Sequence, residues 1–369
     1  MLGYFGRARS PTVHSLIRIM TLDVSFLTQL SASADSLTQH LDHFSQAKVL
    51  VVGDLTLDEF LSGQVERLSR EAPVLILRHE ATRQIPGGGA NAVYNLASLG
   101  ATVKVAGFVG KDEQGLALRR IFEQAGIETE GMLLDPDRPT VTKTRISGHA
   151  RQSVTQQIVR IDRKSDRLPD LELQLQLADY IRSSLETVDA VVCSDYGDGV
   201  LTPITIEAAL SHALTVVDTQ KDLHRFAGAS LFTPNLPEAE LAVGYSITDE
   251  SSLAQAGKDL LKLTQANHIL ITRGEDGMSL FSAHSEDAPP SSFHIPAFNR
   301  TDVFDVTGAG DTVVSALTLG LCGSASLWEA AVLGNLAASL VVRQFGTATT
   351  SIEQMKETLR ALLSDTSSL

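Results

Sequence analysis

The sequence predicts an α/β fold in which helices flank a mostly parallel central sheet, with a small second β-sheet beside it. Short runs rich in Val, Ile and Leu alternate with longer segments of helical spacing, and this alternation is typical of parallel strands joined by crossover helices. Two stretches, residues 60–85 and 140–163, instead alternate polar and apolar side chains, as strands do. With 43% hydrophobic residues among 369, the chain can bury the core of one large domain or two small ones.

The expected elements of the central sheet follow one another in strand–helix order. The expected strands are residues 48–53, 103–109, 190–194, 214–218 and 268–272. The expected helices are residues 90–99, 115–125, 171–185, 204–213, 252–264, 312–322 and 327–343. Ligands of such sheets bind at the carboxyl ends of the strands. The polar residues at or just past those ends are Asp54, Ser194, Asp195, Asp218 and Arg273.

Residues 1–46 form an expected N-terminal extension and leading helix, ahead of one domain of residues 47–369. Residues 27–45 have helical spacing and are expected to pack on the edge of that domain. Residues 1–19 contain three arginines but no acidic residue, and Met20 follows. A targeting peptide has this composition, and so does a segment upstream of a true start at Met20. We favour the second interpretation because the segment is short and mixed in character.

Charge and cysteine content restrict the function classes. The formal net charge of -14 argues against non-specific binding to nucleic acid or to an anionic membrane surface. Cys193 and Cys322 are the only cysteines and lie far apart in the sequence, so neither a disulfide framework nor a zinc site is expected. No apolar run reaches the ~18 residues of a membrane span. We therefore expect a cytoplasmic protein that acts on small molecules, with no nucleic-acid or membrane partner.

The most informative stretch, residues 305–311, reads Asp-Val-Thr-Gly-Ala-Gly-Asp and leads into the apolar run 312–322. Its glycines allow a tight turn, so that the amides of Ala309, Gly310 and Asp311 can point at one anion from a helix N-terminus. A carboxylate beside a bound phosphate suits a base that removes a proton from an attacking hydroxyl, as in phosphoryl transfer to an alcohol. The alternative is a tight turn with an Asp helix cap.

Two further stretches suit the binding of a polyol. Residues 87–89 are glycines that permit close approach of the backbone to a ligand, and Asn91 offers an amide that both donates and accepts. The same stretch fits the dinucleotide pattern Gly-x-Gly-x-x-Ala, but residues 82–86 before it are not the buried strand that this pattern requires. Asp54 and Asp58 follow the first strand and can accept hydrogen bonds from neighbouring hydroxyls, although a capping role is an alternative for Asp58.

Three motifs together resemble the signatures of the PfkB, or ribokinase-like, sugar kinases. They are residues 305–311, residues 86–100 (Pro-Gly-Gly-Gly-Ala-Asn-Ala-Val-Tyr-Asn-Leu-Ala-Ser-Leu-Gly) and residues 233–238 (Thr-Pro-Asn-Leu-Pro-Glu), in the family's order and spacing. The resemblance covers about residues 49–351. It implies ATP and Mg²⁺, and a ribokinase-like fold in which the two β-type segments form a lid over the sugar that pairs across a homodimer. Such a lid excludes water from the reaction; the alternative is two ordinary surface hairpins.

The resemblance implies roles for the matching residues on the sugar side. Asp311 is the implied base, and Gly308, Ala309 and Gly310 form the implied anion-binding turn in front of it. The residues with implied sugar contacts are Asp54, Asp58, Gly88, Gly89 and Asn91.

On the nucleotide side, the resemblance implies that Asn235 and Glu238 organise the phosphates and hold Mg²⁺ through water. Magnesium keeps most of its waters, so one carboxylate is sufficient. Asp305 and Thr307 match positions that line a monovalent-cation site in some relatives, so K⁺ is a further expected ligand. The other implied nucleotide contacts are Thr272, Arg273, Gly274, Gly277 and Asn335.

Within the family, residues 71–74, 142–145 and 194–197 are most similar to the kinases that act on the anomeric hydroxyl of D-glycero-β-D-manno-heptose 7-phosphate. By this resemblance, three lid cations neutralise the phosphate of the substrate. They are Lys143, Arg145 and Arg160. The alternative is that these are solvated charges on the lid.

Two departures from that group leave the substrate open. The group carries Lys where this chain has Asp198, and Pro-Lys where this chain has Thr219-Gln220 after Asp218, with Lys221 one position along. A Lys-to-Asp exchange reverses the local field. The alternatives are therefore a ribokinase-like kinase for another sugar or a nucleoside, or a catalytically silent sugar or nucleotide sensor.

Overall fold

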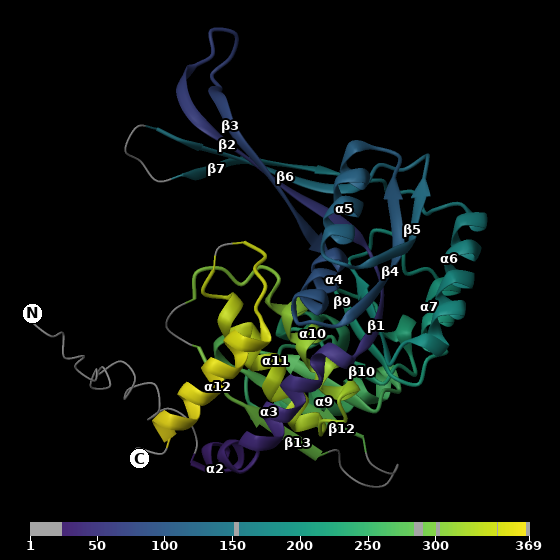
Figure 1. Cartoon of the computed structure of the whole chain (residues 1–369), viewed down its shortest axis with the longest axis vertical. Coiled ribbons are helices and arrows are strands. Elements are labelled where there is room, and N and C mark those ends of the chain that lie inside the picture. The colour runs from purple at the N-terminus through teal and green to yellow at the C-terminus, as the bar shows by residue number, and fades with distance from the viewer. Residues whose placement is uncertain (1–23, 151–154, 284–290, 300–302, 345, 367–369) are drawn as a thin grey trace, which may run out of the picture.

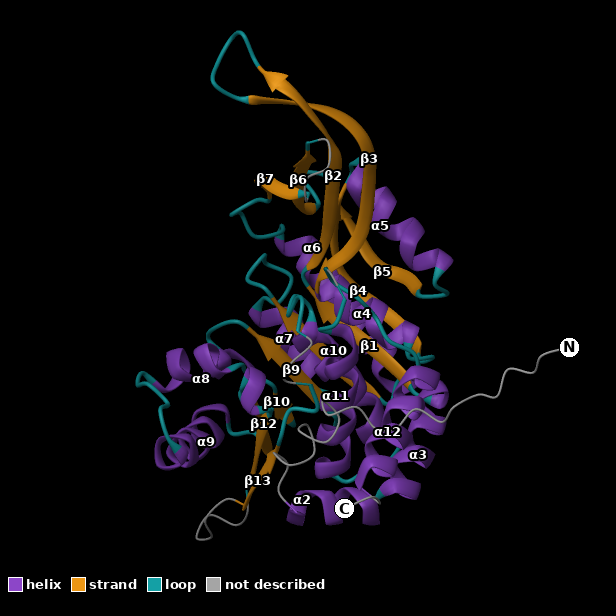
Figure 2. Ribbon diagram, turned by 90° about the vertical axis from the view of Figure 1, so that its left-hand side faces the viewer, coloured by secondary structure: helices purple, strands orange, loops and turns teal. Residues whose placement is uncertain are grey.

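The computed structural model describes residues 24–150, 155–283, 291–299, 303–344 and 346–366, which form two sheets and the helices around them (Figures 1 and 2). The larger sheet has nine strands in the order β13-β12-β11-β10-β9-β8-β1-β4-β5. Its strands are β1 (Lys48–Gly53), β4 (Thr102–Gly110), β5 (Glu128–Asp135), β8 (Ala190–Asp195), β9 (Thr215–Thr219), β10 (Leu231–Phe232), β11 (His268–Thr272), β12 (Met278–Ser282) and β13 (Ser291–Ile295).

The large sheet is parallel except at one edge. Neighbouring strands from β5 to β11 pair in parallel, and only the β11–β12 and β12–β13 pairs are antiparallel. Every residue of β8 is buried, and in β1 only Lys48 is exposed. Strands that are covered on both faces carry the continuous apolar runs seen in the sequence. The predicted mostly parallel sheet is therefore confirmed.

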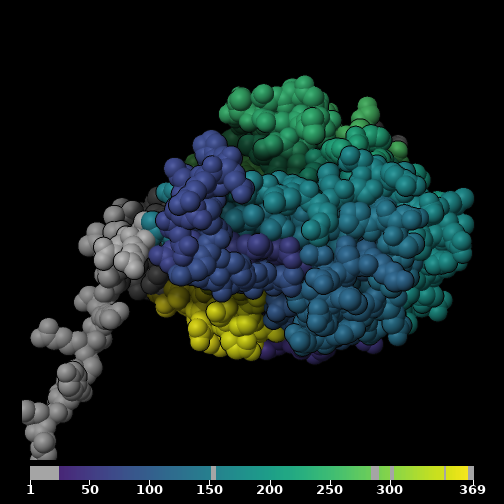
Figure 3. All heavy atoms as spheres, turned by 90° about the horizontal axis from the view of Figure 1, so that it is seen from above, coloured from purple at the N-terminus to yellow at the C-terminus, as the bar shows by residue number. Residues whose placement is uncertain are grey.

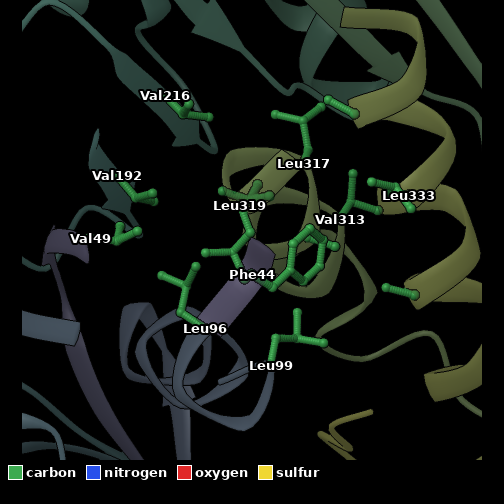
Figure 4. Packing of buried hydrophobic residues seen from close by; sticks show 14 of the residues in the cluster. Phe44, Val49, Leu96, Leu99, Val192, Val216, Val313, Leu317, Leu319 and Leu333 are labelled. Atoms are coloured by element: carbon green, nitrogen blue, oxygen red, sulfur yellow. The ribbon is translucent and has the colours of Figure 1, made fainter. Parts of the chain in front are cut away.

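Helices cover both faces of the large sheet and create two hydrophobic cores. One core lies under α3, α4, α5, α10, α11 and α12, and the other under α6, α7, α8 and α9. Figure 4 shows part of the first core, where Phe44 and Leu319 lie between Leu96 and Leu99 on one side and Leu317 on the other. The helices are α2 (Val24–Ala32), α3 (Ala34–His43), α4 (Gly89–Ser98), α5 (Glu113–Gln124), α6 (Leu171–Ser184), α7 (Pro203–Leu210), α8 (Leu236–Val243), α9 (Glu250–Thr264), α10 (Ala309–Cys322), α11 (Leu327–Val341) and α12 (Ile352–Thr366).

The smaller sheet, which we call the lid sheet, projects from one end of the large sheet (Figures 1 and 2). Its order is β3-β2-β6-β7, with antiparallel β2–β3 and β6–β7 pairs and a parallel β2–β6 pair. Its strands are β2 (Leu55–Leu68), β3 (Leu75–Gly88), β6 (Val141–His149) and β7 (Gln156–Arg163). The expected β-type stretches 60–85 and 140–163 lie in these strands, but β2 begins almost directly after β1.

Several elements differ from the sequence-based expectation. The expected helix 27–45 is two helices, α2 and α3, which meet at Ser33. The sequence did not predict strands β5, β10, β12 and β13 or helix α12. Strands β5, β12 and β13 contain Gly, Ser or charged residues and lie at or next to an edge of the sheet, so they lack the apolar runs of the central strands. Strand β10 has only two residues, too few for such a run. The expectation for residues 1–19 lies outside the described residues.

Candidate active site

Asp311 lies in the first turn of α10, and only 3% of its side chain is exposed. Both of its carboxylate oxygens accept hydrogen bonds from elements distant in sequence. The Asn91 amide of α4 donates to Oδ2 at 2.8 Å, and the Tyr196 hydroxyl donates to Oδ1 at 3.1 Å. Helices α4 and α10 pack against each other below the lid sheet (Figure 2). The two contacts therefore fix the direction of the carboxylate.

The surroundings of Asp311 raise its pKa to about 6, chiefly through burial. The hydrogen bonds from Asn91 and Tyr196 and the positive charge of Lys143 oppose this rise. Burial also raises the pKa of Tyr196 well above 10, so its hydroxyl stays a donor at neutral pH. A carboxylate with a pKa near 6 is ionised at pH 7.5, yet it is a stronger base than an ordinary Asp.

We expect kcat/KM for sugar phosphorylation to rise with pH through an apparent pKa of about 6. The ionised form of Asp311 is the predicted base, and its pKa is about 6, so protonation below that value should remove the base. The measurement is the pH profile of kcat/KM between pH 5 and 9. A profile that is flat from pH 5 to 7 would contradict the role of Asp311.

Replacing Tyr196 by Phe should move that acid limb to higher pH. The hydroxyl stabilises the ionised form of Asp311, so its loss should raise the pKa of Asp311 by roughly half a unit to one unit. The ionisations of the substrates are identical for both enzymes and cancel in the comparison. Tyr245→Phe is the matched control, because Tyr245 donates to Asp259 (2.8 Å) far along the chain. An unchanged limb in Tyr196→Phe would refute the coupling.

The N-terminus of α10 offers two free amides where the sequence predicted three. The N–H of Ala309 donates to the carbonyl oxygen of Val306 at 3.2 Å. In the described parts of the chain, no backbone acceptor is recorded for the N–H groups of Gly310 and Asp311. Gly308 allows the turn, because its φ is +79° and a Cβ there would lie 2.5 Å from Nδ2 of Asn91. Two amides and the helix dipole remain to bind an anion.

A cavity of about 170 Å³ lies in front of this turn. It brings together three of the four predicted catalytic residues and three of the seven predicted nucleotide contacts, although these segments lie far apart in sequence. Its lining includes Gly308, Gly310, Asp311, Asn235, Glu238 and Thr272, together with Asp195, Tyr196, Asp218, Gln220 and Thr233. Tyr196 and Asp218 are functional candidates that the motifs did not assign, although both lie at or just past the end of an expected strand.

Asn235 and Glu238 form a reciprocal cap at the start of α8. The Asn235 side chain accepts from the N–H of Glu238 at 2.9 Å, and the Glu238 carboxylate accepts from the N–H of Asn235 at 2.8 Å. This capping box holds the Glu238 carboxylate at the cavity wall. Burial raises the pKa of Glu238.

The lining of this cavity includes four acidic side chains and no Lys or Arg. Burial raises the pKa of Asp218 well above its ordinary value, and the nearby carboxylates of Asp311, Glu238 and Asp195 raise it further. Among the residues that the structure describes, no group of three His, Cys, Asp or Glu side chains is arranged to hold a metal ion directly. Carboxyl oxygens around a cavity without cationic side chains in its lining suit Mg²⁺. This ion binds through one or two carboxylates and keeps several waters.

Asp54, which the resemblance places at the sugar, accepts three backbone hydrogen bonds from one loop. Its Oδ2 accepts from the N–H groups of Tyr196 (2.8 Å) and Asp198 (3.0 Å), and its Oδ1 accepts from the N–H of Val200 (3.0 Å). Burial raises the pKa of Asp54 to about 6, although these hydrogen bonds oppose the rise. The carboxylate therefore anchors the loop that carries Tyr196 to the cavity.

Asp58, the second aspartate predicted to contact the sugar, lies in β2 at the base of the lid sheet. It is buried, and its Oδ1 lies 2.9 Å from Nη1 of Arg145. Gly87 makes room for it, because a Cβ on Gly87 would lie 2.7 Å from the Asp58 carboxylate. Gly88 has a φ of +53°, and Gly89 donates its N–H to the carbonyl oxygen of Asp54 at 2.9 Å. The glycine stretch thus packs directly against both aspartates.

The three predicted lid cations lie on the Asp58 face of the lid sheet, because paired strand residues point to the same side. Lys143 Nζ lies 5.5 Å from the centroid of the Tyr196 ring. Arg145 lies over Phe60 at 5.1 Å and pairs with Asp58. Arg160 pairs with Asp162 of its own strand at 2.7 Å. Lys143 is therefore near Asp311, while the two arginines already have carboxylate partners.

The other predicted nucleotide residues lie in the turn between β11 and β12 and on α11. Arg273 donates its N–H to the carbonyl oxygen of Gly277 at 2.8 Å, and Gly277 donates to Gly274 at 3.1 Å. The amide of Asn335 donates to the carbonyl oxygen of Pro296 at 2.7 Å, so it holds the chain after β13. Of the predicted nucleotide set, these four residues do not line the 170 Å³ cavity.

Asp305 and Thr307 lie in a loop tied to the chain after α11. Asp305 accepts from the N–H of Thr307 through Oδ1 and from the N–H of Gly346 through Oδ2, both at 2.9 Å. Burial acts to raise the pKa of Asp305, but the hydrogen bonds from Thr307 and Gly346 and the charge of Arg145 outweigh it and lower the pKa. The ionised carboxylate therefore fixes the entry to α10.

Asp311 lies at a helix N-terminus, in one cavity with Asn235 and Glu238. The model of the pfkB family of carbohydrate kinases matches this chain over residues 46–355. The chain belongs to this family. The predicted family resemblance is thus confirmed, and with it the class of carbohydrate kinase.

Curated pfkB relatives of this chain include two bifunctional proteins. HldE of Desulfatibacillum aliphaticivorans is 41% identical over 323 residues, which cover 86% of this chain and 64% of that protein. HldE of Geobacter sulfurreducens is 39% identical over 315 residues, covering 84% of this chain and 62% of that protein. The chain spans less than two-thirds of the length of these relatives.

Solved structures of pfkB-type kinases share the fold. Phosphofructokinase-2 from Escherichia coli in complex with potassium has a TM-score of 0.67 at 19% identity, covering 86% of this chain and 99% of that one. Ribokinase from Arabidopsis thaliana with ribose and ATP has a TM-score of 0.63 at 17% identity, covering 86% and 98%. These likenesses confirm the predicted ribokinase-like fold. In the described ranges, no helix is both long and apolar enough to cross a membrane.

Proposed function

We propose that this chain transfers the γ-phosphoryl group of ATP to a sugar hydroxyl, with Asp311 as the general base. The observation that carries the proposal is the Asp311 carboxylate, with a pKa of about 6, beside two free amides and in one cavity with Glu238. Asp311 takes the proton of the hydroxyl as its oxygen attacks phosphorus. The amides of Gly310 and Asp311 stabilise the charge on the transferring group.

Asn91 and Tyr196 orient the base in this mechanism, and the lid sheet excludes water from it. Asn235 and Glu238 bind the nucleotide side, and the hydroxyl lies between Asp311 and the lid face that carries Asp58. Glu238 and Asp218 would hold Mg²⁺ through water, and the ion would neutralise phosphate charge there. A monovalent cation such as K⁺ at the Asp305 and Thr307 loop is part of the same proposal.

The proposed substrate is D-glycero-β-D-manno-heptose 7-phosphate, converted to the 1,7-bisphosphate. Its support is the resemblance of residues 142–145 and 194–197 to that group and the 41% identity with a protein named HldE. Asp198, which stands where the similar kinases carry Lys, argues less strongly against this substrate than the sequence alone suggested. Asp198 lies 3.5 Å from Lys164, which offsets its charge, and it lines a small cavity with Asp54 rather than the one with Glu238.

We also propose that the protein is cytoplasmic and that it forms a homodimer through the lid sheet. The outer strand β7 is exposed along its whole length. It carries three apolar side chains that are 42–52% exposed, namely Ile158, Val159 and Ile161. An unpaired edge with exposed apolar residues favours pairing with a second chain.

The experiment that tests this function is an assay of ADP release with a panel of sugars and sugar phosphates. The proposal expects the highest kcat/KM with the heptose 7-phosphate, and product mass should show one added phosphate. Higher kcat/KM with a pentose, hexose or nucleoside would keep the kinase and replace its substrate. Nucleotide binding without ADP release for any sugar would indicate a sensor.

A further inference from the structure

We propose that a second, larger cavity beside Asp311 holds the end of the substrate remote from the reacting hydroxyl, and that Arg83 binds a phosphate group there. The inference rests on the proposed kinase function and names the part of the site that selects a phosphorylated sugar. Arg83 belongs to none of the motifs that identified the family.

The cavity has a volume of about 600 Å³ and lies between β3, α4, α5 and the chain after α11. Arg83 and Pro86 line it from β3, Asn91 and Tyr94 line it from α4, and Thr347 lines the far side. Its volume is in the range of small-molecule sites. Figure 3 shows the blue strands of the lid sheet beside the yellow C-terminal region that closes this side of the molecule.

Asn91 connects this cavity to the reaction centre. Its side chain lines the cavity, and the same amide donates to Asp311 at 2.8 Å. Gly308 lies between the two spaces, because a Cβ there would be 2.5 Å from Asn91 Nδ2 and 3.1 Å from Cγ2 of Thr347. A sugar whose reacting hydroxyl contacts Asp311 can therefore extend past Asn91 into the larger cavity.

The register of the lid sheet places Arg83 on the same face as the substrate-side cations. Phe60 of β2 pairs with Arg83 on one side and with Arg145 on the other, and Arg145 pairs with Arg160. Paired residues point to the same face of a sheet. The charge of Arg145 reaches Asp305, so this face is directed toward the loop that begins the catalytic turn.

Arg83 differs from Arg145 and Arg160, the other two arginines on this face of the lid sheet, in its hydrogen-bond and ion-pair partners. Arg145 pairs with Asp58, and Arg160 pairs with Asp162. Among the described residues, no hydrogen bond or ion pair is recorded for Arg83, which is exposed at the cavity. A guanidinium with no carboxylate partner, in a chain of net charge -14, retains its full capacity to bind a phosphate through two parallel hydrogen bonds.

Each of the two cavities therefore binds one of the two anionic groups of the reaction. The nucleotide phosphates lie with Glu238 and the amides of α10, while the phosphate already on the sugar lies with Arg83. This separation keeps two highly charged groups on opposite sides of Asn91, and the sugar ring spans the distance between them.

The test compares Arg83→Ala and Arg83→Lys with wild type, using D-glycero-β-D-manno-heptose 7-phosphate and the unphosphorylated heptose as substrates. Arg78→Ala is the matched control, since Arg78 belongs to the same strand but bonds Gln64 and Glu66 outside the cavity. Arg83→Ala should raise KM for the phosphorylated sugar at least tenfold. It should leave kcat, KM for ATP and KM for the unphosphorylated sugar within about twofold. Arg83→Lys should recover part of the loss.

Equal KM values for wild type and Arg83→Ala with the 7-phosphate would overturn the inference, and so would equal increases for both sugars. If wild type uses the unphosphorylated heptose as well as its 7-phosphate, the kinase stands and the phosphate site is refuted. If wild type turns over no sugar, the proposed function fails. Calorimetric titration with the 7-phosphate then decides the inference alone: at least tenfold weaker binding by Arg83→Ala supports it, and equal or absent binding refutes it.

Discussion

Replacing Asp311 by Asn is expected to lower kcat by at least about 10³-fold while the Kd for ATP changes less than about threefold. The amide keeps the shape of the side chain but cannot take the proton of the attacking hydroxyl, and general base catalysis contributes 10²–10⁴-fold. The groups proposed for the nucleotide, Glu238 and the free backbone amides, stay in place. The measurements are single-turnover ADP release and calorimetric titration with ATP. Turnover within tenfold of wild type would exclude the assigned role.

The stability of the same variant serves as its folding control. The pKa of Asp311 is about 6 in the folded protein against an ordinary value of 3.8, so the folded state binds its proton more tightly than the unfolded state. The stability linked to this proton is present below pH 4 and is lost as the pH rises through 6. The ionised carboxylate at pH 8 therefore costs up to about 3 kcal/mol. The difference in Tm between Asp311→Asn and wild type should become more positive from pH 5 to pH 8.

Replacing Asp54 by Ala is expected to lower the free energy of unfolding by about 2–4 kcal/mol. The change leaves the N–H groups of Tyr196, Asp198 and Val200, which are buried or partly buried, without their acceptor, and each such loss costs up to about 1–3 kcal/mol. Relief of burying the charge offsets part of this cost. Because the loop holds the Tyr196 hydroxyl against Asp311, kcat should also fall. Denaturant unfolding and steady-state kinetics measure the two effects.

The matched variant is Asp58→Asn, four residues further along the chain, in strand β2. Asp58 pairs with Arg145 on the lid face and accepts no backbone N–H of the loop. It should therefore raise KM for the sugar with a smaller loss of stability than Asp54→Ala. If Asp54→Ala keeps wild-type stability and changes only KM for the sugar, Asp54 contacts the substrate and does not anchor the loop.

The parts of the site that could be predicted from sequence are those encoded within one short segment. The turn before α10 and the cap at Asn235 and Glu238 each depend on residues three to six positions apart, and the glycines and acidic residues reveal them directly. The parallel sheet could be predicted for a similar reason, since its central strands are continuous apolar runs.

The role of Asp54 could not be predicted, because its three hydrogen-bond donors lie about 142–146 positions away in the chain. Only the parallel pairing of β1 with β8 brings them together. Arg83 was missed for a related reason. Its position beside Arg145 depends on the register of three lid strands, and β-type alternation identifies a strand without giving its partner.

The close approach of Asp54 and Gly89 bears on how the family diversifies. The chain leaves the large sheet after Gly53, runs through β2 and β3, and returns at Gly89, whose N–H donates to the carbonyl oxygen of Asp54 at 2.9 Å. The two ends of the β2–β3 insert therefore lie next to each other. Such an insert can be lengthened, shortened or replaced without moving either end, so the lid sheet can change while the large sheet and the turn before α10 keep their positions.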